Sequence, residues 1–118
     1  MLPKKNRLSK NNEFRNLFKK GKSFKSDCLL IRLLPNKKDF NRFGFIVSLK
    51  ISKKAVVRNK IKRALRQIIR ENFLKIRKGF DLAIITFPGI EKKSYRQIKE
   101  IIEELFEKAK LINNDQNG

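Results

Sequence analysis

The sequence contains no histidine and only one cysteine, Cys28. Without histidine the commonest general base in enzymes is missing, and neither a Ser-His nor a Cys-His catalytic arrangement can form. A lone cysteine excludes a disulfide framework and a cysteine metal cluster, and it fits a reducing, cytoplasmic compartment. The chain also has no Gly-rich phosphate loop. We therefore expect no catalytic residue and no metal site in this protein.

Long hydrophobic runs are missing too. No apolar stretch reaches the length of a membrane span, and residues 1–25 lack the apolar centre of a signal peptide. Both features argue against a membrane protein. A basic amphipathic helix can also bind anionic lipid, but the apolar side of the helix described below is expected to face a protein core.

Acidic residues are scarce, with 11 Asp and Glu against 31 Lys and Arg in 118 residues, which gives a formal net charge of +20. A hydrophobic fraction of 40% excludes a disordered tail. Residues 1–79 contain 25 basic and 4 acidic residues, whereas residues 80–118 contain 6 and 7. One part of the chain therefore carries the positive field, which is typical of proteins that bind phosphates.

The length predicts one domain over residues 1–118 with a modest core, in which residues 1–8 and 112–118 are flexible. The pattern of apolar residues, caps and turns predicts the order α-β-β-β-α-β-α, an α+β sandwich with helices packed on a mixed sheet. The expected elements are a helix capped by Ser9 or Asn11 and ended by Gly21, strands over 22–25, Cys28–Leu34 and Arg42–Leu49, a helix over Lys53–Arg77, a strand over Phe80–Phe87, and a last helix after a Ser94–Gln97 capping box. The loop after Leu34 has a length consistent with an antiparallel hairpin.

The helix expected at 53–77 combines heavy positive charge with regular apolar spacing. One arc holds Val57, Ile61, Ala64, Leu65, Ile68 and Ile76, and the opposite side holds Asn59, Arg63, Arg66 and Arg70, with Lys62 on the flank. Only Glu71 interrupts the cations, and a stack of cations repels itself unless a polyanion lies against it. A solvated basic face is the simpler alternative. We interpret this side of the helix as a nucleic-acid contact.

Phe14 and Phe18, one helical turn apart, form a second group. They can simply fix the short helix to the sheet, or one edge of them can line a groove for unstacked bases, with Lys19, Lys20 and Lys22 beside it. Arg32 is unusual in an apolar strand: it either marks the wet face of that strand or projects into the same groove. We expect Cys28 to be a small residue at the edge of the core.

At these residues the chain resembles the protein subunit of bacterial ribonuclease P, over nearly its whole length. The matching segments are Arg7-Leu8-Ser9-Lys10, Glu13-Phe14-Arg15, Phe18-Lys19-Lys20-Gly21, Phe43-Gly44-Phe45-Ile46-Val47-Ser48, the signature Ala55-Val56-Val57-Arg58-Asn59-Lys60-Ile61-Lys62-Arg63, Gly79-Phe80-Asp81, Pro88-Gly89 and the last amphipathic helix.

The resemblance implies a fold similar to the second domain of a small-subunit ribosomal protein, with a left-handed crossover through the basic helix. It also implies that the catalyst is a partner RNA with bound Mg²⁺, which removes the 5′ leader from precursor tRNA. The protein would be a non-catalytic, cytoplasmic subunit that binds ribonuclease P RNA and precursor tRNA, guides the leader and lowers the Mg²⁺ requirement. Neither DNA nor a membrane is an expected partner.

Site residues carry over by position. The contacts expected with the catalytic RNA are Arg58, Asn59, Lys60, Lys62, Arg63 and Arg66, to which the helix pattern adds Arg70; those expected in the leader cleft are Phe14, Phe18 and Arg32, with Lys19 and Lys22 beside them. Lys60 replaces the usual arginine, and Arg32 stands where relatives often have a tyrosine. Arg58 lies at the border of the apolar arc, so it can brace the helix end as well as touch RNA. Two other functions stay open, a general structured-RNA binding or assembly module and a protein-only nuclease.

Overall fold

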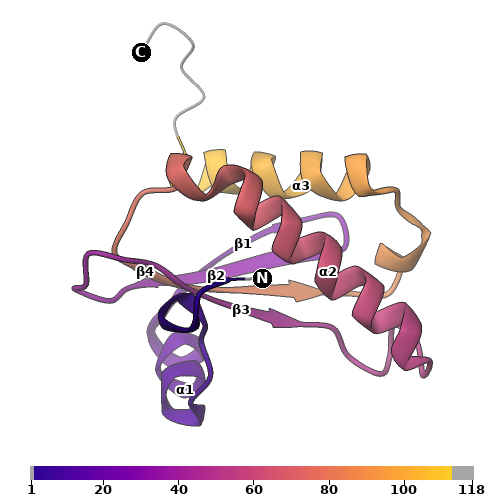
Figure 1. The fold of residues 1–118 in the computed structure, drawn as a ribbon, viewed down its shortest axis with the longest axis horizontal. Helices are drawn as coiled ribbons and strands as arrows, with labels where there is room; N and C mark the ends of the chain where they lie inside the picture. The colour runs from indigo at the N-terminus through magenta and orange to yellow at the C-terminus, as the bar shows by residue number, and fades with distance from the viewer. Residues whose placement is uncertain (1, 113–118) are drawn as a thin grey trace, which may run out of the picture.

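The computed structural model describes residues 2–112, which form four strands and three α-helices (Figure 1). In chain order these are α1 (Asn11–Lys20), β1 (Lys22–Ser26), β2 (Leu29–Pro35), β3 (Arg42–Ile46), α2 (Ala55–Asn72), β4 (Phe80–Thr86) and α3 (Tyr95–Lys108). Short 3₁₀ turns occupy Lys4–Asn6, Phe73–Lys75 and Ile90–Lys92. The predicted α+β class and element order are confirmed. Within residues 2–112, no helix has both the length and the apolar character needed to cross a bilayer.

The sheet is mixed and its strands lie in the order β1-β2-β4-β3. β2 is antiparallel to both β1 and β4, and β3 is parallel to β4, so that α2 forms the crossover between the two parallel strands. The predicted hairpin between the second and third strands is wrong, because β4 lies between them. β4 is apolar on both faces and therefore takes a central place, where it pairs along both edges.

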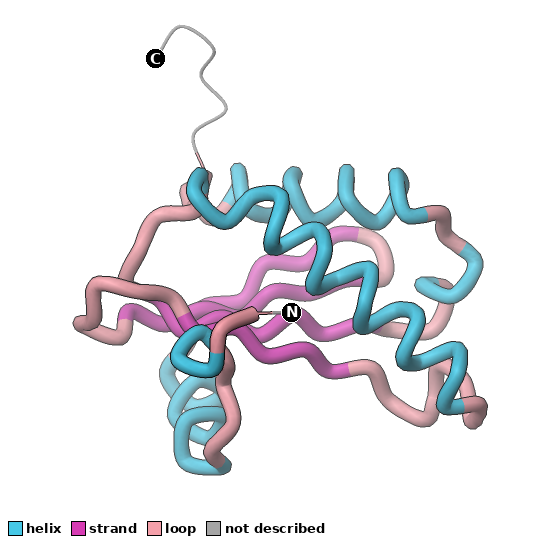
Figure 2. Tube along the Cα trace, viewed as in Figure 1, coloured by secondary structure: helices cyan, strands magenta, loops and turns pink. Residues whose placement is uncertain are grey.

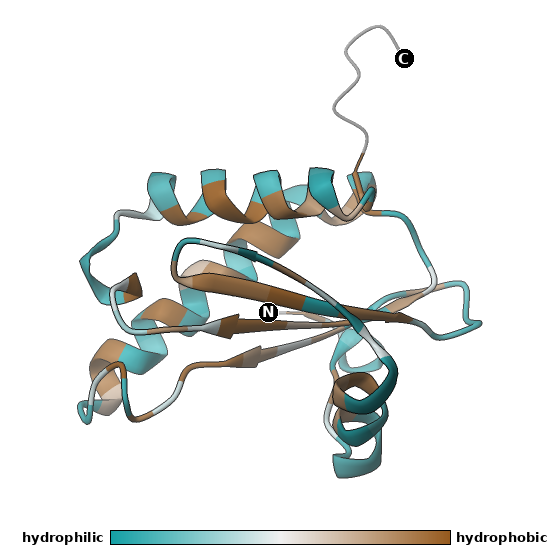
Figure 3. Cartoon of the chain, turned by 180° about the vertical axis from the view of Figure 1, so that it is seen from behind, coloured by the Kyte–Doolittle hydropathy of each residue, from teal (hydrophilic) through white to brown (hydrophobic). Residues whose placement is uncertain are grey.

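Helices cover both faces of the sheet: α2 and α3 lie on one side and α1 lies on the other (Figures 1 and 2). The larger core cluster joins the sheet to α2 and α3, with Leu65, Ile68, Ile102 and Phe106 fully buried. In Figure 3 much of the sheet is brown, interrupted by teal and white segments, whereas the helices alternate between brown and teal, as expected for helices with one apolar side. A smaller cluster under α1 centres on Leu17.

Several element ends differ from the prediction. α2 ends at Asn72 instead of Arg77, and Ile76 is extended backbone although it is buried as expected. The Asn72 amide donates to the Ile68 carbonyl at 3.0 Å and to Glu103 at 3.0 Å, so its side chain satisfies a carbonyl of the last turn and ties the helix end to α3. β3 ends at Ile46 rather than at Leu49.

The amino-terminal segment, predicted to be flexible over residues 1–8, is packed in its described part. Leu2 and Leu8 are buried, the Asn6 amide donates to the Asn41 carbonyl at 2.7 Å, and the Leu8 N–H donates to the Phe43 carbonyl at 2.8 Å. The segment thus extends the outer edge of β3, which satisfies backbone groups that an edge strand leaves open. The other stretch predicted to be flexible is 112–118, and all of it except residue 112 lies outside the described residues.

The helix caps were partly predicted. Ser94 and Gln97 form the expected capping box at the start of α3. α1 is different, because neither Ser9 nor Asn11 caps it with its side chain. Instead the Glu13 carboxylate accepts hydrogen bonds from the backbone N–H groups of Ser9 and Lys10, both at 3.2 Å.

Candidate nucleic-acid interface

The basic side of α2 is accessible to solvent. Asn59, Lys60, Arg63 and Arg70 are exposed, and Lys62 and Arg66 are partly buried. Within residues 2–112, none of these six side chains takes part in an ion pair or a side-chain hydrogen bond. Their donors are therefore free to meet an external acceptor, and the apolar residues opposite them fix the helix on the sheet.

Glu71, the one acid of this helix, is turned away from its cations. Its carboxylate forms an ion pair with Lys99 of α3 at 3.0 Å and accepts a hydrogen bond from the Tyr95 hydroxyl at 2.9 Å. Hydrogen bonds from Lys99, Tyr95 and Gln67 hold the pKa of Glu71 below its usual range. Burial and then the Glu71 carboxylate raise the pKa of Tyr95 to about 12. The acid thus serves the α2–α3 contact and leaves the cationic side without a counter-charge.

Arg58 differs from the rest of the signature. It is partly buried, and its Nη1 donates to the Ser52 carbonyl at 2.8 Å, one turn before the helix begins. Since Lys54 at the N-cap makes no side-chain capping bond, Arg58 anchors the chain that enters the helix. The position of Arg58 at the border of the apolar arc had indicated this bracing role.

Arg66 lies beside a cavity that the sequence did not reveal. The cavity has a volume of about 170 Å³, and Leu2, Arg7, Leu8, Phe43, Gly44, Phe45 and Arg66 line it. Arg7 is held there because its Nε donates to the Leu2 carbonyl at 2.9 Å. The packed amino-terminal segment therefore places a further cation beside the basic side of α2.

On the other face of the sheet, Leu17 and not a phenylalanine provides the main anchor of α1. Leu17 is fully buried against Leu8 and Ala83, while Phe14 is partly buried and Phe18 is 43% exposed. The two rings stack with their centroids 6.4 Å apart. Phe14 therefore contributes to docking, and Phe18 presents much of its ring to solvent.

Beside α1 the sheet exposes a row of apolar side chains. Ala83 and Gly44 lie under α1, and the next row on the same face is Leu30, Ile85 and Ile46, all partly buried. Lys19 and Lys22 are exposed, with no ion pair among the described residues. This side of the molecule combines apolar and aromatic surface with cations, as single-stranded nucleic-acid sites do.

Arg32 points at α1. Its guanidinium donates to the carbonyl of Leu17 at 2.9 Å, to that of Phe18, and to the Ser23 hydroxyl at 2.6 Å. These carbonyls belong to the last turn of α1, where the Leu17 carbonyl also accepts from the Gly21 N–H at 2.9 Å, so Arg32 adds a side-chain donor to the end of the helix. Neither of the two alternatives weighed for Arg32 anticipated this capping role.

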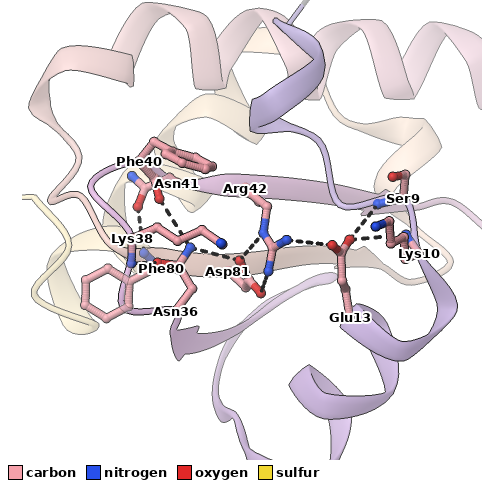
Figure 4. Close-up of polar contacts among 10 residues, drawn as sticks. All are labelled: Ser9, Lys10, Glu13, Asn36, Lys38, Phe40, Asn41, Arg42, Phe80 and Asp81. Carbon is pink, nitrogen blue, oxygen red and sulfur yellow. Dashed lines mark hydrogen bonds and ion pairs between the residues drawn. The ribbon is translucent and has the colours of Figure 1, made fainter.

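A polar network that reaches the first turn of α1 at Glu13 was also missed in the sequence (Figure 4). Arg42 donates to both carboxylate oxygens of Asp81, at 2.8 and 2.7 Å, and its third nitrogen donates to Glu13. Asn36 donates to the same Asp81 carboxylate at 3.0 Å. The available signal was Asp81 itself, a lone acid in an apolar strand, because a buried carboxylate needs a partner.

The structure also bears on two kinds of chemistry, that of the Cys28 thiol and that of metal ions. Cys28 is buried as expected, and burial together with the neighbouring Asp27 raises the pKa of its thiol. In the part of the chain that the structure describes, no three His, Cys, Asp or Glu side chains lie close enough together to hold a metal ion. The arrangement can bind a polyanion on one side and a stacked base on the other.

Comparison with known proteins matches the chain as a whole to one family. The family model described as Ribonuclease P matches residues 2–110. The ribonuclease P protein component of Clostridium acetobutylicum is 40% identical over 117 residues, which cover 98% of each chain. A 2.0 Å structure of the Staphylococcus aureus RNase P protein has a TM-score of 0.85 and 32% identity, and covers 92% of this chain and 98% of that one. A second S. aureus structure, of a mutant with defective mRNA degradation activity, has a TM-score of 0.86 and 32% identity, over 92% of each chain.

Proposed function

The chain belongs to the ribonuclease P protein family and is the RNA-binding accessory subunit of that ribonucleoprotein endoribonuclease, and from this membership we propose which of its surfaces meet which RNA. The catalytic RNA binds the basic side of α2 through Asn59, Lys60, Lys62, Arg63, Arg66 and Arg70, with Arg58 bracing the helix start. The observation that carries this assignment is the lack of any ion pair or side-chain hydrogen bond for the first six residues within the described part of the chain. Phosphate oxygens are the acceptors that such donors fit best.

The substrate is precursor tRNA, and its single-stranded leader lies along α1. Phe18 offers an exposed ring for a base, Phe14 supports that ring, and Lys19 and Lys22 contact phosphates. Arg32 acts here as a positioning residue, because its guanidinium holds the end of the helix that carries Phe18. This assignment keeps all five predicted cleft residues at the leader but changes the way in which Arg32 contributes.

A protein between the two RNAs lowers the Mg²⁺ requirement. An RNA catalyst and an RNA substrate repel each other, and a subunit with a formal net charge of +20 reduces that repulsion, so that fewer Mg²⁺ ions, all held by the RNA, are needed. Leader contacts absent from mature tRNA favour substrate over product. The proposal includes residues 1–118 acting as one domain in the cytoplasm, where a lone free thiol persists.

The test is leader cleavage of precursor tRNA at low millimolar Mg²⁺ by the protein alone, by bacterial ribonuclease P RNA alone, and by both. Strong cleavage only with both supports the proposal. No gain from the protein would leave a general structured-RNA binding or assembly module. The protein-alone arm also receives an mRNA, because one of the S. aureus structures is that of a mutant with defective mRNA degradation activity. Cleavage in that arm would indicate a protein-only nuclease.

A matched pair of double variants tests the RNA-binding side. Replacing Arg63 and Arg66 with Ala removes two cations from the basic side of α2, and replacing Lys75 and Lys78 with Ala removes two exposed cations beyond the end of α2. Holoenzyme assembly at physiological salt should weaken about 10-fold or more with the first pair and change little with the second. Equal effects would mean that the basic side of α2 is only a solvated surface.

A further inference from the structure

A second positively charged pocket lies at the end of the sheet where β1 begins and α3 ends. Its volume is about 490 Å³, and its cations come from three separate segments of the chain: Lys20 and Lys22, Arg77, and Lys108 and Lys110. No acidic side chain is among the described residues that line it, and none of the five cations has an ion pair within residues 2–112. Cations without ion pairs that converge from distant parts of the chain create a positive potential, which favours the binding of an anion.

The wall of this pocket is apolar and aromatic. Phe24 and Phe80 line it and are partly buried. The Arg77 guanidinium lies over the Phe80 ring, 5.7 Å from its centroid, and one of its nitrogens donates to the Lys110 carbonyl at 3.2 Å. Arg77 is therefore held in place while it stays exposed, and a guanidinium fixed in this way can stack on a base.

Lys110 occupies a strained position at the rim. Its φ is 60°, in the left-handed region, directly after the C-cap residue of α3. The Leu111 N–H donates to the Phe106 carbonyl at 2.8 Å, which closes the helix in the manner that normally uses glycine. A lysine here adds backbone strain that glycine would avoid. The reason for a lysine at position 110 must therefore lie in its side chain and not in the backbone conformation.

We propose that this pocket binds single-stranded RNA and receives leader nucleotides upstream of those at Phe18. The inference rests on the proposed function. Lys22 belongs to both the proposed leader site and the pocket, so a strand that leaves α1 past Lys19 and Lys20 reaches the pocket directly. The cations would contact phosphates, and a base would stack on Arg77 or pack against Phe24.

Lys110→Gly separates the role of the side chain from that of the fold. The variant removes one cation and relieves the strain, so the protein should unfold at the same or a higher temperature. Lys37→Gly is the matched control, since Lys37 also has a left-handed φ, of 61°, and is exposed, but it does not line the pocket. Both variants have the same net charge.

The experiment measures the affinity of reconstituted holoenzyme for precursor tRNAs whose leaders are lengthened stepwise. With wild-type protein and Lys37→Gly, affinity should rise with leader length until the pocket is filled. Lys110→Gly should bind the short-leader substrate normally and the long-leader substrate about three- to tenfold more weakly, with a shallower salt dependence.

Three results would overturn the assignment. Equal affinities of wild type and Lys110→Gly for every leader would show that the pocket does not touch RNA. Equal weakening for short and long leaders would show a general charge effect. Polyglutamate serves as a second probe: if Lys110→Gly weakened the binding of polyglutamate and of RNA equally, the pocket would be a site for any polyanion. Loss of the proposed function looks different, because then wild-type protein would not stimulate cleavage of even the short-leader substrate.

Discussion

Arg42 and Asp81 form a two-point ion pair across the parallel strands β3 and β4, with Nε–Oδ1 at 2.8 Å and Nη2–Oδ2 at 2.7 Å. The Asp81 side chain is only 7% exposed, and the hydrogen bond to it is the main cause that raises the pKa of Arg42. The remaining Arg42 nitrogen binds Glu13, whose carboxylate caps the start of α1. Three charges from three elements thus set the position of the helix that carries Phe14 and Phe18.

Replacing Arg42 with Gln should destabilise the protein by about 2–4 kcal/mol, because Asp81 and Glu13 lose their shared cation while Asp81 stays buried. Urea unfolding measures the loss. Asp81→Asn alone and the double variant complete a thermodynamic cycle, in which the double variant should cost clearly less than the two single losses together. A loss of only about 0.5 kcal/mol for Arg42→Gln would place the pair with exposed surface ion pairs and contradict this interpretation.

Arg32→Ala should loosen the end of α1. The change leaves the Leu17 and Phe18 carbonyls without their side-chain donor, and a lost hydrogen bond to a charged group costs about 1.5–3 kcal/mol. Hydrogen exchange at the Gly21 amide, which donates to the Leu17 carbonyl at 2.9 Å, should speed up more than exchange in β4. Leader affinity should fall with it.

Arg32→Tyr distinguishes positioning from direct contact. Tyrosine can stack on a base but cannot donate hydrogen bonds to two carbonyls at once. The Gly21 amide of Arg32→Tyr should therefore exchange as fast as that of Arg32→Ala. If the tyrosine variant restored slow exchange, the carbonyl contacts of Arg32 would not be what holds the helix end.

The sequence predicted the helices well because their spacing is a local property. The period of α2 predicted the buried Ile61, Leu65 and Ile68 and the cations opposite them, although it missed the buried Ile69, and the capping box predicted the start of α3. The sheet order depends on pairing between distant segments. Consecutive strands usually lie side by side, which favours a β2–β3 hairpin. In the structure β4, which is apolar on both faces, lies between β2 and β3 instead.

The polar part of the site was the hardest to predict. Asp81 indicated a need for a cation, but the chain offers 31 basic residues and nothing local selects Arg42. The role of Arg32 depends on where α1 ends relative to β2, which only the packed structure shows. The sequence pattern predicts a loose basic segment that includes Leu2 and Leu8, because the edge of β3 that receives them is more than thirty residues away.

Tyr95 is the only tyrosine in the chain, so its ionisation can be followed by ultraviolet absorbance. The pKa should be about 12 in the folded protein and about 10 after unfolding. Because the folded pKa is the higher one, the contribution of Tyr95 to stability is complete below pH 10 and is lost as the pH rises from about 10 to about 12. In Glu71→Gln the folded pKa should fall toward its ordinary value, and an unchanged titration would contradict the Tyr95–Glu71 contact.

Gly44→Ala should displace the ring that supports the proposed leader site. A Cβ at this position would lie 2.7 Å from Cζ of Phe14 and 3.3 Å from Cβ of Leu8, closer than carbon atoms pack. The Phe14 ring must move, which should cost about 1–3 kcal/mol of stability and disturb its stacking on Phe18. Holoenzyme carrying this variant should lose affinity for precursor tRNA but keep its affinity for mature tRNA, which has no leader. Adding Phe14→Leu makes room for the new methyl group, so the double variant should be more stable than Gly44→Ala alone. If the second change gave no recovery, a clash between the new methyl group and the Phe14 ring would not be the cause of the lost stability.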